Sequence, residues 1–249
     1  MRTNSFLMVV SANFLASTAL AGTMGSVSQP INYSWVATLS AGPVWESAGS
    51  TQTLNLSPTI EKAYVADQSN HTLFDGEFFL GLQKTISQTM QGQLGLAVAA
   101  NSTATLSGVI WDDALPEFDN FIYNYKIQHT HVAVKGKLLA DSGYWLIPWV
   151  SGSIGVGFNN AHSFLNTPII FEALPTPNFA SNTETVFTYT VGAGVQKALN
   201  NHWQVGIGYE FADWGKSQLS RAEGQTLNSG LTLNHFYTNG VLFNLTYLA

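Results

Sequence analysis

Eight segments of this chain alternate apolar and polar or small residues with a period of two, which is the period of a β-strand. In the C-terminal stretch GVLFNLTYLA, the apolar residues are Val241, Phe243, Leu245 and Tyr247. A strand that closes a sheet has both edges paired, so we expect this last segment to complete a closed sheet. Helical signals are scarce, and the sequence therefore predicts an all-β fold.

The predicted strands and connections follow a regular order along the chain. The strands are expected at about 32–44, 73–84, 92–102, 122–138, 144–158, 187–196, 203–211 and 240–249. Long connections are expected at 45–72, 103–121, 159–185 and 215–230, with short turns between the other strands. This alternation is typical of an up-and-down barrel with long outer loops and short periplasmic turns.

The composition narrows the class of protein. Only 10% of the residues are charged and 45% are hydrophobic, whereas a soluble domain carries about 25% charged residues. The net charge of −6 argues against nucleic acid as a partner, and the absence of cysteine excludes disulfides and thiolate metal sites. No run of about 18 apolar residues predicts a membrane-spanning helix.

The N-terminus predicts export. Residues 1–21 have a positive start at Arg2, an apolar run and the small-x-small site Ala19-Leu20-Ala21, so we expect a signal peptide cleaved after Ala21. Cleavage would leave the mature chain one unit more negative. A flexible lead-in at 22–30 and a barrel domain at 31–249 follow. The remaining choice is between a membrane barrel and a soluble exported β-protein.

Aromatic residues favour the membrane barrel. If the first strand rises from the periplasm, two interfacial belts form. The lower belt contains Trp35, Tyr144, Trp203 and Tyr247, and the upper belt contains Trp45, Phe74, Phe158, Phe187, Tyr189 and Phe211. The inward face is rich in Gly, Ser, Thr and Gln, although Phe79, Trp145, Ile147 and Trp149 fall on it too. Eight strands enclose only enough space for their own side chains, which predicts a packed polar interior.

The fourth predicted strand changes its parity. Tyr123, Tyr125 and Ile127 are apolar near its start, whereas Val132 and Val134 are apolar later. This change predicts either a β-bulge or a change of environment along the strand.

By this pattern, the chain resembles the small OmpA/OmpX-like and opacity-type outer-membrane β-barrel proteins of Gram-negative bacteria over about Ile31 to Ala249. Its final strand is similar to their assembly signal, but this chain ends Tyr247-Leu248-Ala249 instead of in an aromatic residue. The resemblance implies an eight-stranded antiparallel transmembrane β-barrel in the outer membrane. It also implies contact with outer-membrane lipid and lipopolysaccharide, and with the barrel-assembly machinery through the C-terminal strand.

Two groups of candidate ligands stand out. Asp112, Asp113, Glu117 and Asp119 could bind a divalent cation, but their spacing matches no known calcium loop, and a solvated acidic loop is favoured. His129 and His131 share a strand face that would suit a metal pair. No third ligand stands nearby, so hydrogen-bonded histidines are favoured and no metal site or cofactor is expected.

Four charged residues point to the lumen. Glu77 and Glu210 face inward, and Lys135 and Lys137 join them if the fourth strand follows its lower parity. Buried charges need partners, so we expect an internal ion-pair network that plugs the barrel, with an ion path as the alternative.

Other motifs carry no expected chemistry. Gly192-Ala193-Gly194 and Gly206-Ile207-Gly208 lie inside strands and lack the third glycine of a nucleotide loop. His235 and Thr238 only approximate the His-x-Ser-Asn motif of lipid A deacylases, and three residues apart they face opposite sides of a strand. No catalytic residue is therefore expected.

These observations predict a non-enzymatic outer-membrane barrel that presents four extracellular loops, with a structural, adhesion or surface-interaction role and a host or surface ligand at the loops. The alternative is a narrow porin-like channel for small solutes. A lipid A-modifying enzyme and a soluble exported β-protein are less favoured.

Overall fold

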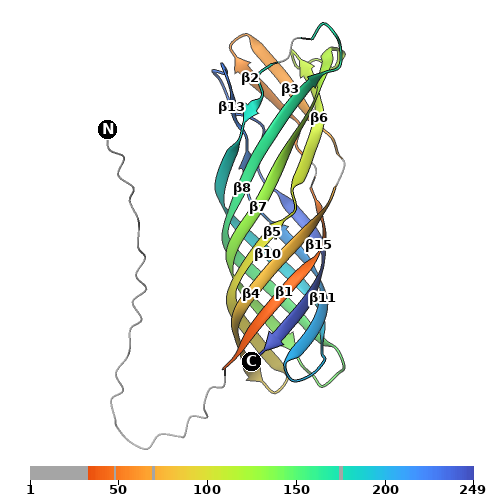
Figure 1. Ribbon diagram of the computed structural model, residues 1–249, viewed down its shortest axis with the longest axis vertical. Helices are drawn as coiled ribbons and strands as arrows, with labels where there is room; N and C mark the ends of the chain where they lie inside the picture. The colour runs from red at the N-terminus through yellow and green to blue at the C-terminus, as the bar shows by residue number, and fades with distance from the viewer. Residues whose placement is uncertain (1–32, 48, 69–70, 174–175) are drawn as a thin grey trace, which may run out of the picture. The chain divides into compact units, whose positions relative to one another are not determined.

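The computed structural model describes residues 33–47, 49–68, 71–173 and 176–249 (Figure 1). The predicted signal peptide at 1–21 and lead-in at 22–30 lie outside these residues. No helix within them is long and apolar enough to cross a membrane.

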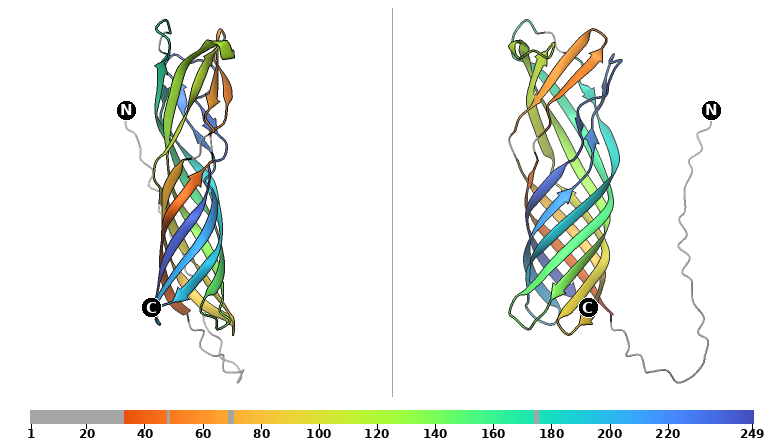
Figure 2. Two further views of the ribbon diagram at one scale, coloured as in Figure 1. Left: turned by 90° about the vertical axis from the view of Figure 1, so that its right-hand side faces the viewer. Right: turned by 180° about the vertical axis from the view of Figure 1, so that it is seen from behind.

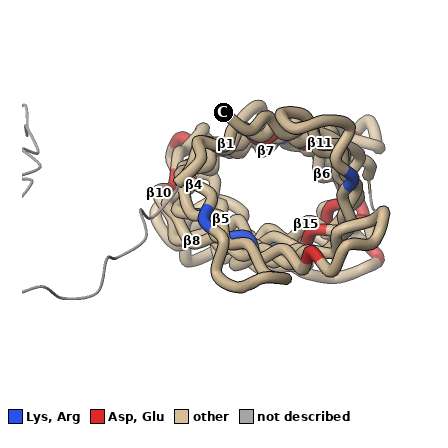
Figure 3. The backbone as a smooth tube through the Cα atoms, turned by 90° about the horizontal axis from the view of Figure 1, so that it is seen from below, with Lys and Arg blue, Asp and Glu red and all other residues tan. Residues whose placement is uncertain are grey.

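Eight strands of the described chain close into an antiparallel ring, which confirms the predicted fold (Figures 1 and 3). In ring order they are β1 (Tyr33–Glu46), β4 (Thr72–Ser87), β5 (Met90–Asn101), β7 (Asp119–Ala140), β8 (Ile147–Pro168), β10 (Asn182–Ala198), β11 (Trp203–Asp213) and β15 (Tyr237–Leu248). Short turns join β4 to β5, β7 to β8 and β10 to β11, as the sequence predicts.

The C-terminal strand closes this ring. β15 lies between β11 and β1, with Tyr247 opposite Trp203 on one side and Ala37 on the other. The backbone N–H of Ala249 donates to the carbonyl of Trp35 at 3.0 Å. The alternating run at the end of the chain is therefore the seam of the barrel.

The outer surface of the ring is an apolar band between two aromatic girdles. Aliphatic side chains predicted to face outward are exposed, including Leu39, Leu80, Leu96, Val134 and Ile154. The predicted lower aromatic residues are all exposed, and so are Trp45, Phe74, Phe158 and Phe187 at the upper edge, while Tyr189 and Phe211 are half-buried. An apolar exterior of this kind on a closed barrel belongs in lipid.

The lower girdle has two further members, Tyr33 and Trp145, with the ammonium groups of Lys84 and Lys197 5.6 and 5.4 Å from their ring centres. Trp145 is 72% exposed, which corrects its predicted inward position. The reason is that β8 starts at Ile147, three residues later than expected. The segment before it forms the turn, where Gly143 has a φ of +78°.

The long outer connections predicted at 45–72, 103–121, 159–185 and 215–230 contain β-structure of their own. β7 and β8, which have 22 residues each, continue beyond the ring. β6 (Ala104–Asp112), β3 (Ile60–Ala66) and β2 (Gln52–Ser57) extend the sheet from β7. The remaining elements are η1 (Pro116–Phe118), β9 (Phe179–Ala180), β12 (Ser217–Gln218), β13 (Ser220–Ala222) and β14 (Thr232–Leu233).

These elements lie at the end of the barrel opposite the C-terminus (Figures 1 and 2). We call them the head, and define it as residues 49–68, 104–128, 160–173, 176–182 and 214–236.

The parity change on β7 is a change of environment. Odd-numbered side chains face inward without interruption from Phe121 to Leu139. From Val132 to Leu138, in the part of β7 nearer the C-terminal end of the strand, the outward side chains are apolar or small. From Phe121 to Thr130, in the part nearer the head, most outward side chains are polar and the inward ones up to Ile127 are apolar. The structure places its register irregularity in the β7–β8 pairing near Asn124, opposite Ser163 with its φ of +56°. Polarity therefore inverts where lipid outside the wall gives way to water.

This boundary makes a testable prediction. Val134 lies near the middle of the lipid-facing part of β7, and Gln128 faces outward just above it. We expect Val134→Arg to lower the free energy of unfolding by about 2–4 kcal/mol, as arginine does near the bilayer midplane. Gln128→Arg should change it by less than about 0.5 kcal/mol. Urea unfolding of barrels refolded in lipid vesicles measures both, and equal costs would contradict the boundary.

Candidate functional site: the lumen and the head

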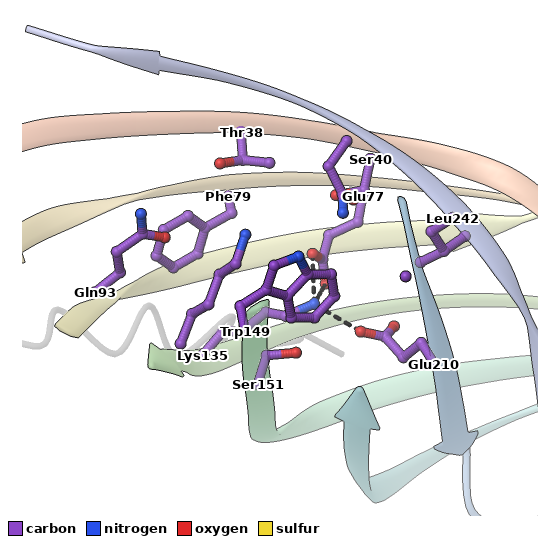
Figure 4. Close-up of a pocket in the computed structure, with 13 residues that line it drawn as sticks. Thr38, Ser40, Glu77, Phe79, Gln93, Lys135, Trp149, Ser151, Glu210 and Leu242 are labelled. Atoms are coloured by element: carbon purple, nitrogen blue, oxygen red, sulfur yellow. Dashed lines mark hydrogen bonds and ion pairs between the residues drawn. The ribbon is translucent and has the colours of Figure 1, made fainter. Parts of the chain in front are cut away.

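A buried ion-pair cluster crosses the middle of the lumen (Figure 4). The ammonium of Lys135 on β7 donates to the two carboxylate oxygens of Glu77 on β4 at 2.6 and 2.9 Å. It also donates to Glu210 on β11 at 2.8 Å. All three side chains are at most 10% exposed. The predicted ion-pair network therefore forms, and it ties together three strands from around the ring.

Lys137 takes a different role from the predicted ion pair. Its ammonium donates to the side-chain carbonyl of Gln196 at 2.7 Å and lies 4.4 Å from the ring centre of Trp149. Gln196 in turn donates to Gln204 at 2.6 Å, and further glutamines bond to one another on the opposite wall. A layer of glutamine amides thus fills the lower lumen.

The paired glycines of β10 and β11 make room for Trp149. Gly194 and Gly208 face each other in register, and a Cβ at either position would collide with the indole ring. Any larger residue there would displace the tryptophan. The glycine pairs of these strands thus serve packing, in keeping with their predicted place inside strands.

The space beside the ion-pair cluster is small. The cavity beside Lys135, Trp149 and Glu210 measures about 30 Å³, which is room for about two water molecules. Phe79, on the predicted inward face, packs there against Val36 and Ala97. Side chains of the barrel thus fill most of the lumen at this level, as the strand number predicts.

Trp214 covers the upper end of the lumen. Its ring centre lies 4.3 Å from that of His129 and 4.7 Å from that of His131. Its indole N–H donates to the hydroxyl of Thr238 at 2.8 Å, and its carbonyl accepts from the Asn159 amide at 2.8 Å. Asn159 also accepts a hydrogen bond from the His129 ring. The two histidines are therefore inner-wall residues packed beneath a lid.

A belt of buried polar groups lies beneath this lid. Asp75 pairs with Asn101 in register, and the next two strands place His129 and Asn159 at the same level. Asp75 Oδ1, both amide atoms of Asn101 and both ring nitrogens of His131 have no partner among the described residues. Because buried polar groups are normally hydrogen-bonded, we expect ordered water at this level.

The described residues hold no cluster of three or more His, Cys, Asp or Glu side chains arranged to bind a metal ion. Asp112 instead pairs with Lys62 and accepts from Asn120 at 2.7 Å. Glu117 lies in η1 and Asp119 begins β7, and both are exposed. The acidic residues singled out from the sequence thus lie at the far tip of the head.

An apolar core fills the head above Trp214. Tyr64, Tyr123, Phe164 and Phe179 form its centre, with the Tyr64–Tyr123 ring centres 5.7 Å apart and the Phe164–Phe179 centres 4.8 Å apart. Burial raises the pKa of the Tyr64 phenol. The head residues thus pack around a core of their own, which continues down to Trp214 and Leu242 in the barrel.

His235 and Thr238, the approximate deacylase motif, are separated by the structure. The His235 ring donates to the Asp213 carboxylate at 2.9 Å and stacks on Tyr237 at the outer rim. Thr238 is buried and bonded to Trp214. The two side chains therefore serve separate contacts.

The sequence pattern did not indicate that Trp214, Asn159 and Thr238 hold the lid. Asn159 and Trp214 fall at the margins of predicted strands, where period-two alternation gives no sign of the inward contacts. One signal for the head was present: Leu106 lies between Thr105 and Ser107, a short alternation inside a predicted loop.

The sequence matches no protein-family model, and no curated protein matches it. Solved structures are similar, however. Neisserial surface protein A has a TM-score of 0.44 and 9% identity, covering 86% of this chain and 96% of that one. The outer-membrane protease OmpT of Escherichia coli has a TM-score of 0.46 and 9% identity, covering 87% and 97%. Ail, the attachment invasion locus protein of Yersinia pestis, has a TM-score of 0.33 and 11% identity, covering 86% and 98%.

The closed ring, the apolar band and the two aromatic girdles make the described chain an outer-membrane β-barrel.

The ion-pair cluster makes a second prediction. Lys135→Met removes the cation and leaves two buried carboxylates, so we expect a loss of about 3–5 kcal/mol in the free energy of unfolding. The triple variant Glu77→Gln, Lys135→Met, Glu210→Gln should recover most of that loss. Lys126→Met on the exposed face is the matched control, with an expected change below about 0.5 kcal/mol. A triple variant no more stable than Lys135→Met, measured by urea unfolding in vesicles, would contradict the cluster.

Proposed function

We propose that this outer-membrane barrel is non-enzymatic, that its lumen does not conduct, and that its head makes contacts at the cell surface. The observation that carries the proposal is the continuity between barrel and head. The outer segments fold around a core that sits directly on a filled lumen.

The filled lumen supports a structural role over the porin-like alternative. The Lys135 cluster, Trp149 and Trp214 occupy the interior at three successive levels. A conducting barrel needs a continuous water path, and the space beside Lys135 is about 30 Å³. The porin-like channel is the second candidate, because the polar side chains that line the lumen would suit the passage of small solutes.

The size of the head supports the interaction role. A transmembrane strand needs about 9–11 residues to cross the bilayer, whereas β7 and β8 have 22 each. About half of each strand therefore serves to build structure outside the membrane. Exposed head residues would contact a host or surface ligand, while the apolar band contacts lipid and lipopolysaccharide.

The contacts of Thr238 and the sequence of β15 support two further parts of the proposed function. Thr238 is bonded to Trp214 and is separated from His235, which favours a non-enzymatic barrel over a lipid A-modifying enzyme. The barrel-assembly machinery would recognise β15, the seam strand, through its alternating apolar residues.

Conductance tests the proposal. In planar bilayers we expect the purified protein to give no steps above the background. We expect the same from Trp149→Ala, which enlarges only the lower lumen, because Trp214 and the head core still close the upper end. Regular ohmic steps from the wild-type protein, increased by Trp149→Ala, would favour the porin-like channel.

A further inference from the structure

Seven large apolar residues are exposed at the tip of the head. We call them the tip patch: Leu115, Phe118, Ile122, Leu165, Ile169, Ile170 and Phe171. Phe171 is 100% exposed and each of the others is at least 42% exposed. Contiguous exposed apolar groups on a water-facing surface are characteristic of interaction sites.

The patch residues come from two neighbouring segments, 115–122 and 165–171. Phe121 pairs with Pro168 and Ile122 with Thr167 across β7 and β8. The backbone N–H of Ile169 donates to the carbonyl of Asn120 at 2.8 Å. These pairings hold the two segments side by side at the tip, and Ile122 and Leu165 both project from the outer face of the paired strands.

The lipid band does not account for this surface. The lipid-facing residues of β7 begin at about Val132, ten positions after the patch residue Ile122. That separation corresponds to roughly 33 Å of strand length. The tip patch therefore lies in water, far from the bilayer in which its own barrel sits.

The patch has an acidic rim. Asp112, Asp113, Glu117 and Asp119 surround its first segment, and Glu172 follows Phe171 directly. Of these five carboxylates, Asp112 has a cation partner in Lys62. The rim therefore carries negative charge, which attracts basic groups and repels anionic lipid, nucleic acid and polyanionic sugars.

We infer that the tip patch is a docking surface for a polypeptide that presents apolar side chains flanked by lysine or arginine. The inference rests on the proposed surface-interaction function and names the partner's chemistry. Phe171 is the main apolar anchor and Ile170 its neighbour, since Phe171 is the most exposed residue of the patch and aromatic anchors that become buried carry much of the binding energy of an interface. The acidic rim selects the basic flanks and speeds their association.

The test uses the full barrel in phosphatidylcholine nanodiscs and three synthetic peptides of equal length: leucine–lysine, serine–lysine and leucine–glutamate. Peptide binding is read by fluorescence anisotropy, with empty nanodiscs as the blank. We expect the leucine–lysine peptide to bind at least about tenfold more tightly than either of the others. Its binding should weaken between about 20 and 150 mM salt, as rim charges are screened.

Variants locate the binding. Ile170→Ser with Phe171→Ser should weaken the leucine–lysine peptide about tenfold or more. Glu117→Gln with Glu172→Gln should weaken it several-fold and flatten the salt dependence. The matched controls are Leu227→Ser, an exposed apolar residue in the connection between β13 and β14, and Glu223→Gln, an exposed carboxylate in the same connection. Both controls should bind as the wild type does.

Several results would overturn the inference. These are equal binding of the leucine–lysine and serine–lysine peptides, tip variants that bind like the wild type, and controls that weaken binding equally. Preferential binding to phosphatidylglycerol vesicles would assign the patch to lipid. Self-association in detergent that Phe171→Ser abolishes would assign it to a second copy of the chain. If the barrel is silent in planar bilayers and still binds no peptide, only the docking inference fails, whereas conductance contradicts the proposed function itself.

Discussion

The backbone hydrogen bonds of the closed ring are the constraint on which the rest of the structure depends. Lipid offers no partner for an unpaired amide, so each strand at membrane depth needs a neighbour on both sides. The pairing of β15 with β1 satisfies the last two edges. Closure also fixes the register of every strand, and with it the face on which each side chain lies. Lys135 meets Glu77 and Glu210 because closure turns all three residues inward.

The paired strands pass from lipid into water, and the polarity of their outward and inward side chains changes with the surroundings. At membrane depth the outer face must be apolar, which leaves the inner face free to carry the Lys135 cluster and the glutamine layer. In the head the outer face meets water, so only the inner face can bury apolar surface, as Tyr123 and Phe164 do. Trp214 lies where the two arrangements meet, with imidazoles below it and an apolar core above it.

Period-two alternation predicts the parts of this fold that depend on one strand at a time. It places the ring strands, the aromatic girdles and the inward charges, because parity alone determines these features. It does not predict the head, where Tyr64, Tyr123 and Phe179 come together from distant segments with no local signal of their pairing. The lid contact of Trp214 with His129 is equally non-local. The parity change on β7 was visible in the sequence, but only the structure shows that the surroundings change while the strand continues.

Continuity of the β7–β8 ladder has a consequence for recognition. The two strands pair from Leu139 opposite Trp149, at the lower end, to Phe121 opposite Pro168, at the tip. Two residues of the tip patch, Ile122 and Leu165, thus lie on strands that are part of the barrel wall, with one register irregularity between the two ends, and the other five directly flank the ends of those strands. The strand-borne part of the surface loses little conformational freedom when a partner binds, and such preorganisation raises affinity for a given contact area. The filled lumen contributes to the same end, since the Lys135 cluster and Trp214 brace the wall from which those strands rise.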